Sequence, residues 1–168
     1  MSLRDAAIRE IFEKPAHWDA GEFVATSNTL QIPRKPLGWT TDYEGIFTSA
    51  QVDTLNAIIS QFERETTNEI AVVTIDRSWT TKEKFDSSIL TLANQWGVGK
   101  ESKNNGVLIG LSAGLRRIRI SNGYGIVSKL SDSETKKIID NTIIPYLKED
   151  TYFEGVRQGL LAIMEKLR

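Results

Sequence analysis

The side chains of this chain that could bind a ligand carry oxygen atoms and lie in polar stretches between apolar segments. Asn104 and Asn105 are adjacent, and Asp42 and Asp132 lie in two other polar stretches. Carboxylate and amide oxygens are the ligands that Ca²⁺ and Mg²⁺ prefer. The chain has no cysteine and one histidine, His17, which excludes Cys-rich zinc sites, histidine-based metal centres and a Ser-His-Asp triad. A metal ion in this protein would therefore need oxygen ligands.

A second group of candidates is a glycine-rich stretch that follows an apolar segment. Gly123, Tyr124 and Gly125 form a G-x-G pattern, and the backbone amides of such a loop, leading toward a helix N-terminus, can hold an anion such as phosphate. An ordinary loop that joins a strand to a helix accounts for the same pattern. Asn104 and Asn105 have a comparable alternative, a tight turn, because asparagine tolerates positive φ angles.

Each carboxylate also has a role that needs no ligand. Asp132 follows Ser131 at the predicted start of a helix, where an acidic side chain complements the helix dipole. Asp42 precedes another predicted helix and could close an Asx-type turn. Asp76 directly follows a predicted strand and is expected to be a simple strand-end residue. The ligand role and the structural role both stay open for Asp42 and Asp132.

Length and composition indicate a globular protein. The chain has 168 residues, of which 40% are hydrophobic and 26% are charged, as is usual for a folded domain. With 21 Lys and Arg against 22 Asp and Glu, its net charge is −1, so no overall positive field favours nucleic acid as a partner. No apolar run approaches the ~18 residues of a membrane span, and we expect neither direct membrane insertion nor a targeting segment in this chain.

The chain is predicted to divide near residue 38. Residues 1–37 contain three of the four prolines and are expected to be an N-terminal arm with one short helix. Residues 38–168 have regular apolar periodicity and are expected to form one domain.

Apolar periods within that domain alternate between helix and strand. Four helices are predicted, over about 49–66, over about 85–96, from about 132 onward and through about 156–167. Thr48 and Gln51 have capping-box spacing at the start of the first helix. Pro145 is expected to kink or end the third helix. Strands are predicted at about 69–75, 107–111 and 116–121, the last two as an antiparallel hairpin. This order predicts an α/β fold, a three-layer α/β/α Rossmann-like sandwich around a small mixed sheet. Arg116, Arg117 and Arg119 are expected to be solvated charges on its edge strand.

The hairpin determines which candidates can meet. Because its two strands run in opposite directions, the loops at about 103–106 and 122–125 are expected to be neighbours at one edge of the sheet. Asp132 opens the next helix and is expected at the same edge. If residues 39–46 run along the sheet, Asp42 reaches this cluster; if they do not, Asp42 shares an edge with Asp76 and forms a second candidate site.

Five segments of the chain, in this order, resemble the TPM domain family. They are residues 41–48, 69–74, 96–99, 103–108 and 120–125, which include the strings Trp96-Gly97-Val98-Gly99 and Asn122-Gly123-Tyr124-Gly125. The resemblance covers roughly residues 40–168. The family includes thylakoid-lumenal photosystem-repair proteins and many bacterial exported or membrane-anchored proteins.

The resemblance implies a Rossmann-like α/β/α sandwich, binding of a divalent cation, Ca²⁺ or Mg²⁺, and an acid-phosphatase activity that some members have. It also suggests a periplasmic or membrane-associated location. The family's usual Asp-Asn-Gly appears here as Asn104-Asn105-Gly106, so one carboxylate of the family pattern is missing.

Two function classes follow from these candidates. In the first, the domain is a metal-dependent phosphomonoesterase, with the cation held by Asp42, Asp132 and the asparagine oxygens, Asp42 as acid/base, and a small phosphomonoester substrate. In the second, the cation is structural and the domain is a non-enzymatic Ca²⁺-binding interaction module for a membrane-associated protein partner in envelope or membrane-complex maintenance.

Overall fold

The computed structural model of the protein describes residues 36–168. The short helix expected in the N-terminal arm therefore lies outside the described residues. Across residues 36–168, no helix combines the length and the apolar character that crossing a membrane requires.

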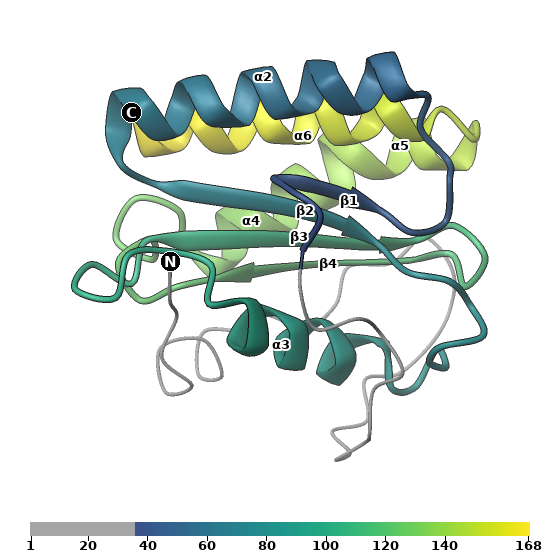
Figure 1. Ribbon diagram of the computed structural model, residues 1–168. Coiled ribbons are helices and arrows are strands. Elements are labelled where there is room, and N and C mark those ends of the chain that lie inside the picture. The colour runs from purple at the N-terminus through teal and green to yellow at the C-terminus, as the bar shows by residue number, and fades with distance from the viewer. Residues whose placement is uncertain (1–35) are drawn as a thin grey trace.

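A four-stranded mixed sheet forms the centre of the domain (Figure 1). Its strands follow the order of the chain: β1 (Thr40–Asp42), β2 (Glu69–Thr74), β3 (Gly106–Ser112) and β4 (Arg117–Asn122). β1, β2 and β3 are parallel, and β4 is antiparallel to β3. The predicted mixed sheet with its antiparallel hairpin is confirmed, and β1 extends it by one short strand.

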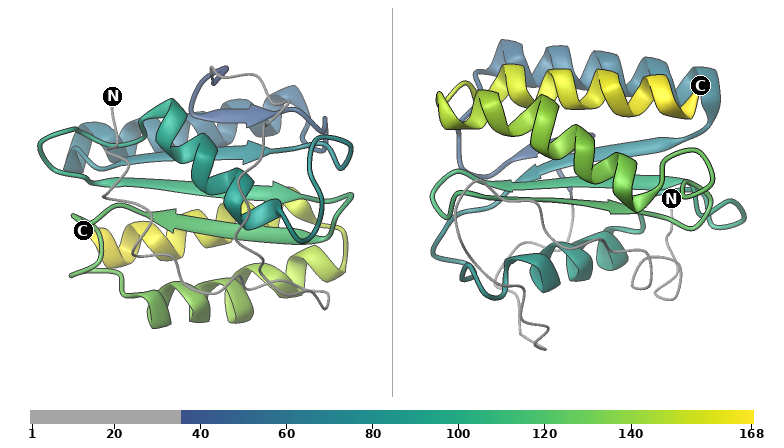
Figure 2. Two further views of the ribbon diagram at one scale, coloured as in Figure 1. Left: turned by 90° about the horizontal axis from the view of Figure 1, so that it is seen from below. Right: turned by 180° about the vertical axis from the view of Figure 1, so that it is seen from behind.

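Helices cover both faces of the sheet. They are α2 (Ser49–Thr66), α3 (Phe85–Trp96), α4 (Asp132–Ile138), the π-helical segment η1 (Ile139–Ile143), α5 (Ile144–Lys148) and α6 (Tyr152–Leu167). α3 lies alone on one face, and the other helices lie on the opposite face (Figures 1 and 2). The three-layer arrangement is the one the sequence predicts. Pro145 neither begins nor ends the helical run at a cap: it lies in the first turn of α5, directly after the π-helical segment η1.

Local sequence signals account for the helix ends. The Thr48 hydroxyl accepts a hydrogen bond from the Gln51 amide, and the Gln51 side chain returns one from the Thr48 amide, which completes a capping box before α2. α3 ends where Gly97 adopts the left-handed conformation, which glycine does at little cost.

Two apolar cores lie on either side of the sheet because side chains alternate along a strand. Ile70 and Val72 of β2 pack toward α2 and α6, whereas Ala71 and Val73 pack toward α3. Every residue of β2, β3 and β4 is buried. The helices therefore fix the sheet from both sides and leave its two ends, where the strands begin and finish, for polar residues.

The arginines of β4 differ from the prediction. Arg117 and Arg119 are 0% and 1% exposed, so the expectation of solvated edge-strand charges is wrong for both. They alternate onto the α3 face of the sheet, where Arg119 pairs in register with Gly110. The guanidinium of Arg117 lies 3.6 Å from the carboxylate of Asp86 on α3, and such a pair offsets part of the desolvation cost of burial.

Very close backbone contacts join the loops before β3 and after β4. The amide of Gly123 donates to the Gly106 carbonyl at 2.8 Å, and the amide of Gly125 donates to the Asn104 carbonyl at 2.9 Å. A Cβ on Gly123 would lie 2.2 Å from the Asn104 carbonyl oxygen, and one on Gly125 would lie 2.0 Å from the Lys103 carbonyl oxygen. Only glycine lets these backbones approach so closely.

Gly125→Ala is expected to lower the free energy of unfolding by about 1–3 kcal/mol, because the new methyl group meets backbone that cannot move independently. Gly114→Ala is the matched control, since its methyl group would meet the side chain of Arg77, nearest at Cδ, 2.9 Å away, and a long exposed side chain can shift. Urea unfolding of both variants measures the difference. Equal unfolding midpoints would show that the loop contact does not constrain the fold.

Candidate functional site

The sequence candidates lie at opposite ends of the strands. We call the end where β2 and β3 begin and β4 finishes the amino edge, and the other end the carboxyl edge. Asn104, Asn105 and Asp132 lie at the amino edge, as predicted from the hairpin. Residues 40–42 do run along the sheet, but parallel to β2 and with Asp42 beside Thr74, so Asp42 lies at the carboxyl edge. β2 separates the two edges by about 17 Å at ~3.3 Å per residue.

Asp42 holds the turn that leads from β1 into α2. Its Oδ2 accepts a hydrogen bond from the Phe47 amide at 2.8 Å, and its Oδ1 accepts one from the Ile46 amide at 3.2 Å. The Thr74 hydroxyl donates to Oδ1 at 2.6 Å. Both carboxylate oxygens therefore have protein donors, which is the turn role that the sequence left open.

Glu44 is a second carboxylate at this edge, and the sequence reasoning missed it. It accepts hydrogen bonds from the amides of Ala113 and Gly114 in the β3–β4 turn, at 2.9 and 3.1 Å. Burial raises the pKa of Glu44, the two amides oppose that shift, and the charges of Asp42 and Asp76 add to it. Its only sequence signal was its place inside the first segment of the family resemblance.

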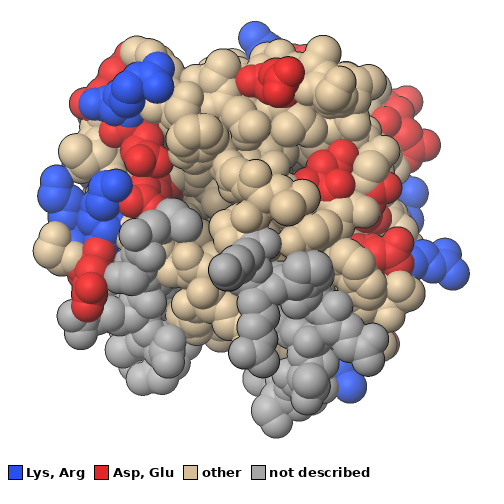
Figure 3. Space-filling view, viewed as in Figure 1, with Lys and Arg blue, Asp and Glu red and all other residues tan. Residues whose placement is uncertain are grey.

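Asp76 completes the acidic side chains of the carboxyl edge. It is half-buried, and hydrogen bonds from the Ser78 hydroxyl and amide lower the pKa of its carboxyl group. In Figure 3, acidic side chains lie over this edge on the right and over the opposite end of the sheet on the left. Asp42, Glu44 and Asp76 are each bound to their own donors, and within residues 36–168 no group of three acidic, histidine or cysteine side chains has metal-site geometry.

At the amino edge, Asn105 connects two loops. Its Oδ1 accepts a hydrogen bond from the Lys100 amide at 2.8 Å, and its Nδ2 donates to the Thr67 carbonyl at 2.9 Å and to Asn68 Oδ1 at 3.3 Å. The side chain is nearly buried, with 4% exposed. Asn105 therefore ties the loop after α3 to the turn after α2, and its amide oxygen already has a donor.

Three other oxygens at this edge lack a donor. The Oδ1 atoms of Asn104, Asn122 and Asp132 are buried and have no hydrogen-bond partner among the described residues. Asn122 uses its Nδ2 to donate to the Thr135 hydroxyl at 2.9 Å, which leaves its oxygen as the unpaired atom. Burial raises the pKa of Asp132, and the charge of Arg119 opposes that shift. Asn122 was not among the predicted site residues, although it lies in the last segment of the family resemblance.

The backbone of the asparagine and glycine loops serves the fold first. Asn104 adopts a positive φ of 49°, as its tight-turn alternative requires. The Gly123 and Gly125 amides donate to backbone carbonyls, so two of the amides that an anion would use are already engaged. Tyr124 between them is 42% exposed.

Each of the donor-free oxygens at the amino edge could serve as a ligand of a cation. Buried oxygens that accept hydrogen bonds but face no donor carry an uncompensated desolvation cost. A divalent cation ligated by amide and carboxylate oxygens removes that cost, and a hard cation such as Ca²⁺ takes both kinds of ligand. These oxygens carry negative charge or partial negative charge, so they would repel an anion.

Comparison with known proteins gives one family. The model of the TPM domain matches residues 40–166. A search of curated proteins found no match.

Three solved structures share the fold. The N-terminal domain of a protein from P. gingivalis is 34% identical, with a TM-score of 0.68 over 77% of this chain and 81% of that one. The BA42 protein of the psychrophilic bacterium Bizionia argentinensis is 20% identical, with a TM-score of 0.64 over 74% and 83% of the two chains. The N-terminal domain of the cg2496 protein of Corynebacterium glutamicum is 13% identical, with a TM-score of 0.56 over 88% of both chains.

Asp42→Ala is expected to lower the free energy of unfolding by roughly 2–3 kcal/mol, because three donors lose a charged acceptor. Asp76→Ala is the control at the same edge and is expected to leave the urea midpoint nearly unchanged, since the hydrogen bonds of its carboxylate, within residues 36–168, come from Ser78 in its own turn. A matching loss of stability in both variants would mean that the contacts of Asp42 do not hold the β1–α2 turn.

Proposed function

The chain belongs to the TPM domain family, and from this membership and the geometry of the amino edge we propose that it is a divalent-cation-binding domain. Asn104, Asn122 and Asp132 would provide the protein ligands. The observation that supports the proposal is the set of donor-free oxygens that these side chains bury at one edge.

The ligand set favours Ca²⁺ over Mg²⁺. It contains one carboxylate and two neutral amide oxygens, and Ca²⁺ accepts such mixed ligands in irregular geometry with water in the remaining positions. Mg²⁺ demands a near-ideal octahedron and releases its water reluctantly. With a single carboxylate, affinity belongs at the weak end of the Ca²⁺ range, because affinity rises with ligand charge.

The cation would join parts of the chain that are distant in sequence. Asn104 lies before β3, Asn122 ends β4, and Asp132 begins α4. A cation shared by these segments would fix the exposed loops around Tyr124, which suits a binding module. The partner we propose for that module is a membrane-associated protein, in accordance with the family resemblance.

A metal-dependent phosphomonoesterase is the second candidate, and family membership is the observation that favours it. In that case the cation would neutralise the phosphate and position water. Asp42 lies at the opposite edge of the sheet from Asp132, so Asp42 could not act as acid/base on a phosphate bound at this cation. We rank this candidate second because the donor-free oxygens at the amino edge include only one carboxylate, that of Asp132.

Calcium titration of the ¹⁵N-labelled protein tests the cation proposal. The amides of residues 104–107 and 122–125 are expected to shift, and Asp132→Asn is expected to weaken binding at least about tenfold because it removes the only charged ligand. Asp42→Asn is the control at the carboxyl edge and is expected to retain wild-type affinity. If Asp42→Asn loses Ca²⁺ binding and Asp132→Asn retains it, the cation belongs to the carboxyl edge.

The pH dependence provides a further test. Because burial raises the pKa of Asp132 in the ion-free protein, protons are expected to compete with Ca²⁺ from a higher pH than for an ordinary aspartate. The same shift means that the folded protein binds this proton more tightly than the unfolded chain, so its contribution to ion-free stability increases as pH falls through the raised pKa. Asp132→Asn is therefore expected to leave ion-free thermal stability at neutral pH equal or higher. A lower melting temperature in excess EDTA would contradict this account.

Hydrolysis of an aryl phosphate separates the two candidates. The binding module predicts no turnover with or without Ca²⁺. Turnover that EDTA abolishes and that Asp132→Asn removes would instead establish the phosphomonoesterase.

A further inference from the structure

We propose that the half of β2 that β1 leaves unpaired, together with the pocket beside it, is a docking site for an extended peptide segment of a partner protein that carries alternating apolar and basic residues. The segment would lie alongside Glu69–Ala71 as an added strand. The site uses none of the proposed cation ligands, so it stands independently of the proposed function.

β3 pairs with the whole of β2, but β1, on the other side, pairs with only half of it. β1 pairs with Val72, Val73 and Thr74, and the amide of Val72 donates to the Trp39 carbonyl at 2.8 Å. Alternate residues of a strand direct their backbone N–H and C=O groups to the same side. Ile70, two residues before Val72, therefore presents its N–H and C=O toward the space where β1 would continue.

The groups of Ile70 have no partner on that side within residues 36–168. Glu69, Ile70 and Ala71 are 3%, 1% and 6% exposed, so bulk water does not replace a partner. Buried backbone groups are nearly always hydrogen-bonded. An added strand would supply the missing acceptor and donor, as in other cases of β-strand addition.

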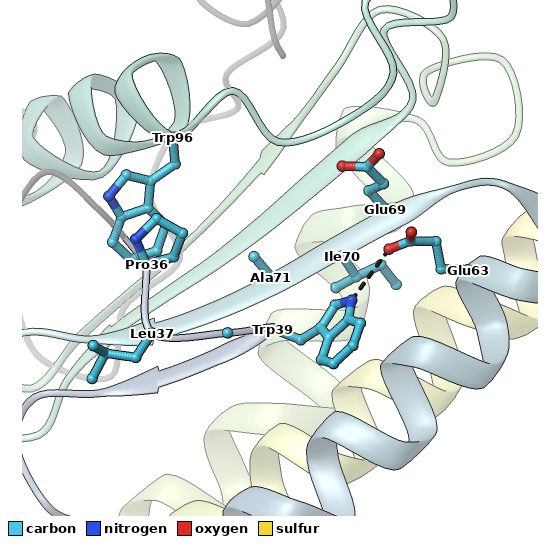
Figure 4. Close-up of a pocket in the computed structure, with 9 residues that line it drawn as sticks. Pro36, Leu37, Trp39, Glu63, Glu69, Ile70, Ala71 and Trp96 are labelled. Carbon is cyan, nitrogen blue, oxygen red and sulfur yellow. Dashed lines mark hydrogen bonds between the residues drawn. The ribbon is translucent and has the colours of Figure 1, made fainter. Parts of the chain in front are cut away.

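A pocket of about 370 Å³ adjoins this half of β2 (Figure 4). Its walls are mainly apolar, and its volume lies within the range of ligand sites. Its lining comprises residues 36–39, Glu63, Glu69, Ile70, Ala71 and Trp96. The pocket can receive one apolar side chain of an added strand.

The outer wall of the pocket is loosely held. Leu37 is 76% exposed, and its amide bonds to the Thr41 side chain of the same segment at 2.9 Å. Among the described residues no backbone hydrogen bond joins residues 36–38 to β2. This wall can shift outward without breaking the sheet and so admit a strand.

The charge at the pocket indicates the chemistry of the segment. Glu63 and Glu69 both line it, and the ammonium group of Lys100 lies 3.6 Å from Glu63 and 2.6 Å from Glu69. Among the described residues, two carboxylates face one ammonium group here, which leaves an excess of negative charge. Glu63 is the more accessible of the two, with its Oε1 bonded to the Trp39 indole N–H at 3.2 Å (Figure 4). A lysine or arginine next to the apolar residue of the segment would complement it.

The probes are two octapeptides, one alternating lysine with valine and one alternating glutamate with valine, added to the full ¹⁵N-labelled chain. The lysine peptide is expected to bind with a Kd between about 1 µM and 1 mM and the glutamate peptide at least about tenfold more weakly. Hydrogen exchange of the Ile70 amide is expected to slow at least about tenfold at saturation, which a side chain in the pocket without strand pairing would not cause.

Three variants locate the site. Ala71→Leu, which fills the pocket, and Glu63→Lys, which reverses its charge, are each expected to weaken the lysine peptide about tenfold or more. Glu65→Lys is the matched control, since Glu65 is on the same helix but pairs with Arg168. The Glu65→Lys variant is expected to bind the lysine peptide with wild-type affinity. The Asp132→Asn variant in excess EDTA is expected to do the same, so failure of the cation proposal would not affect this result.

Several outcomes would overturn the proposal. These are no binding of the lysine peptide at about 1 mM, equal binding of the two peptides, or an Ile70 amide whose exchange does not change at saturation. An Ile70 amide that is already protected in the free protein would assign the site to another part of this chain. Protection that increases with protein concentration would assign it to a second copy.

Discussion

The close approach of three backbone segments at the amino edge constrains the rest of the structure. A Cβ on Gly106 would lie 2.1 Å from the Val98 carbonyl oxygen. A Cβ on Gly123 or Gly125 would lie similarly close to the carbonyl oxygen of Asn104 or Lys103. These contacts set the position of β3 relative to the loop after α3 and of β4 relative to the loop before β3. They also bring Asn104 and Asn122 to one edge. The chain then leads from that edge to α4, which Asp132 begins. Packing by hydrophobic side chains alone would not define these positions so closely, because side chains can adjust where backbone cannot.

The two edges of the sheet differ in how their oxygens are satisfied. At the carboxyl edge, Asp42 and Glu44 accept hydrogen bonds from backbone amides of the β1–α2 and β3–β4 turns. Their charges therefore stabilise turns, and a cation would have to compete with those amides. At the amino edge, the oxygens of Asn104, Asn122 and Asp132 have no such donors within residues 36–168. The donor-free oxygens, and not the number of acidic residues, are therefore the reason for placing the proposed cation at the amino edge.

The sequence predicts the elements better than the site. The capping box at Thr48 and the apolar period that follows are local signals, and α2 has the predicted bounds of 49–66. β1 has only three residues, too few for a period, so the direction of the segment and the edge of Asp42 could not be decided from sequence. The burial of Arg117 and Arg119 depends on what packs against the α3 face of β4, which is tertiary information. Asn122 leaves its side-chain oxygen without a donor whereas Asn105 does not, and that difference too requires the structure.

The most direct test of the cation assignment is a crystal structure grown with Mn²⁺ or a lanthanide in place of Ca²⁺, with anomalous scattering used to locate the ion. We expect one anomalous peak at the amino edge, within about 2.6 Å of the Oδ1 atoms of Asn104, Asn122 and Asp132. A peak at the carboxyl edge beside Asp42, Glu44 and Asp76, with none at Asp132, would contradict it.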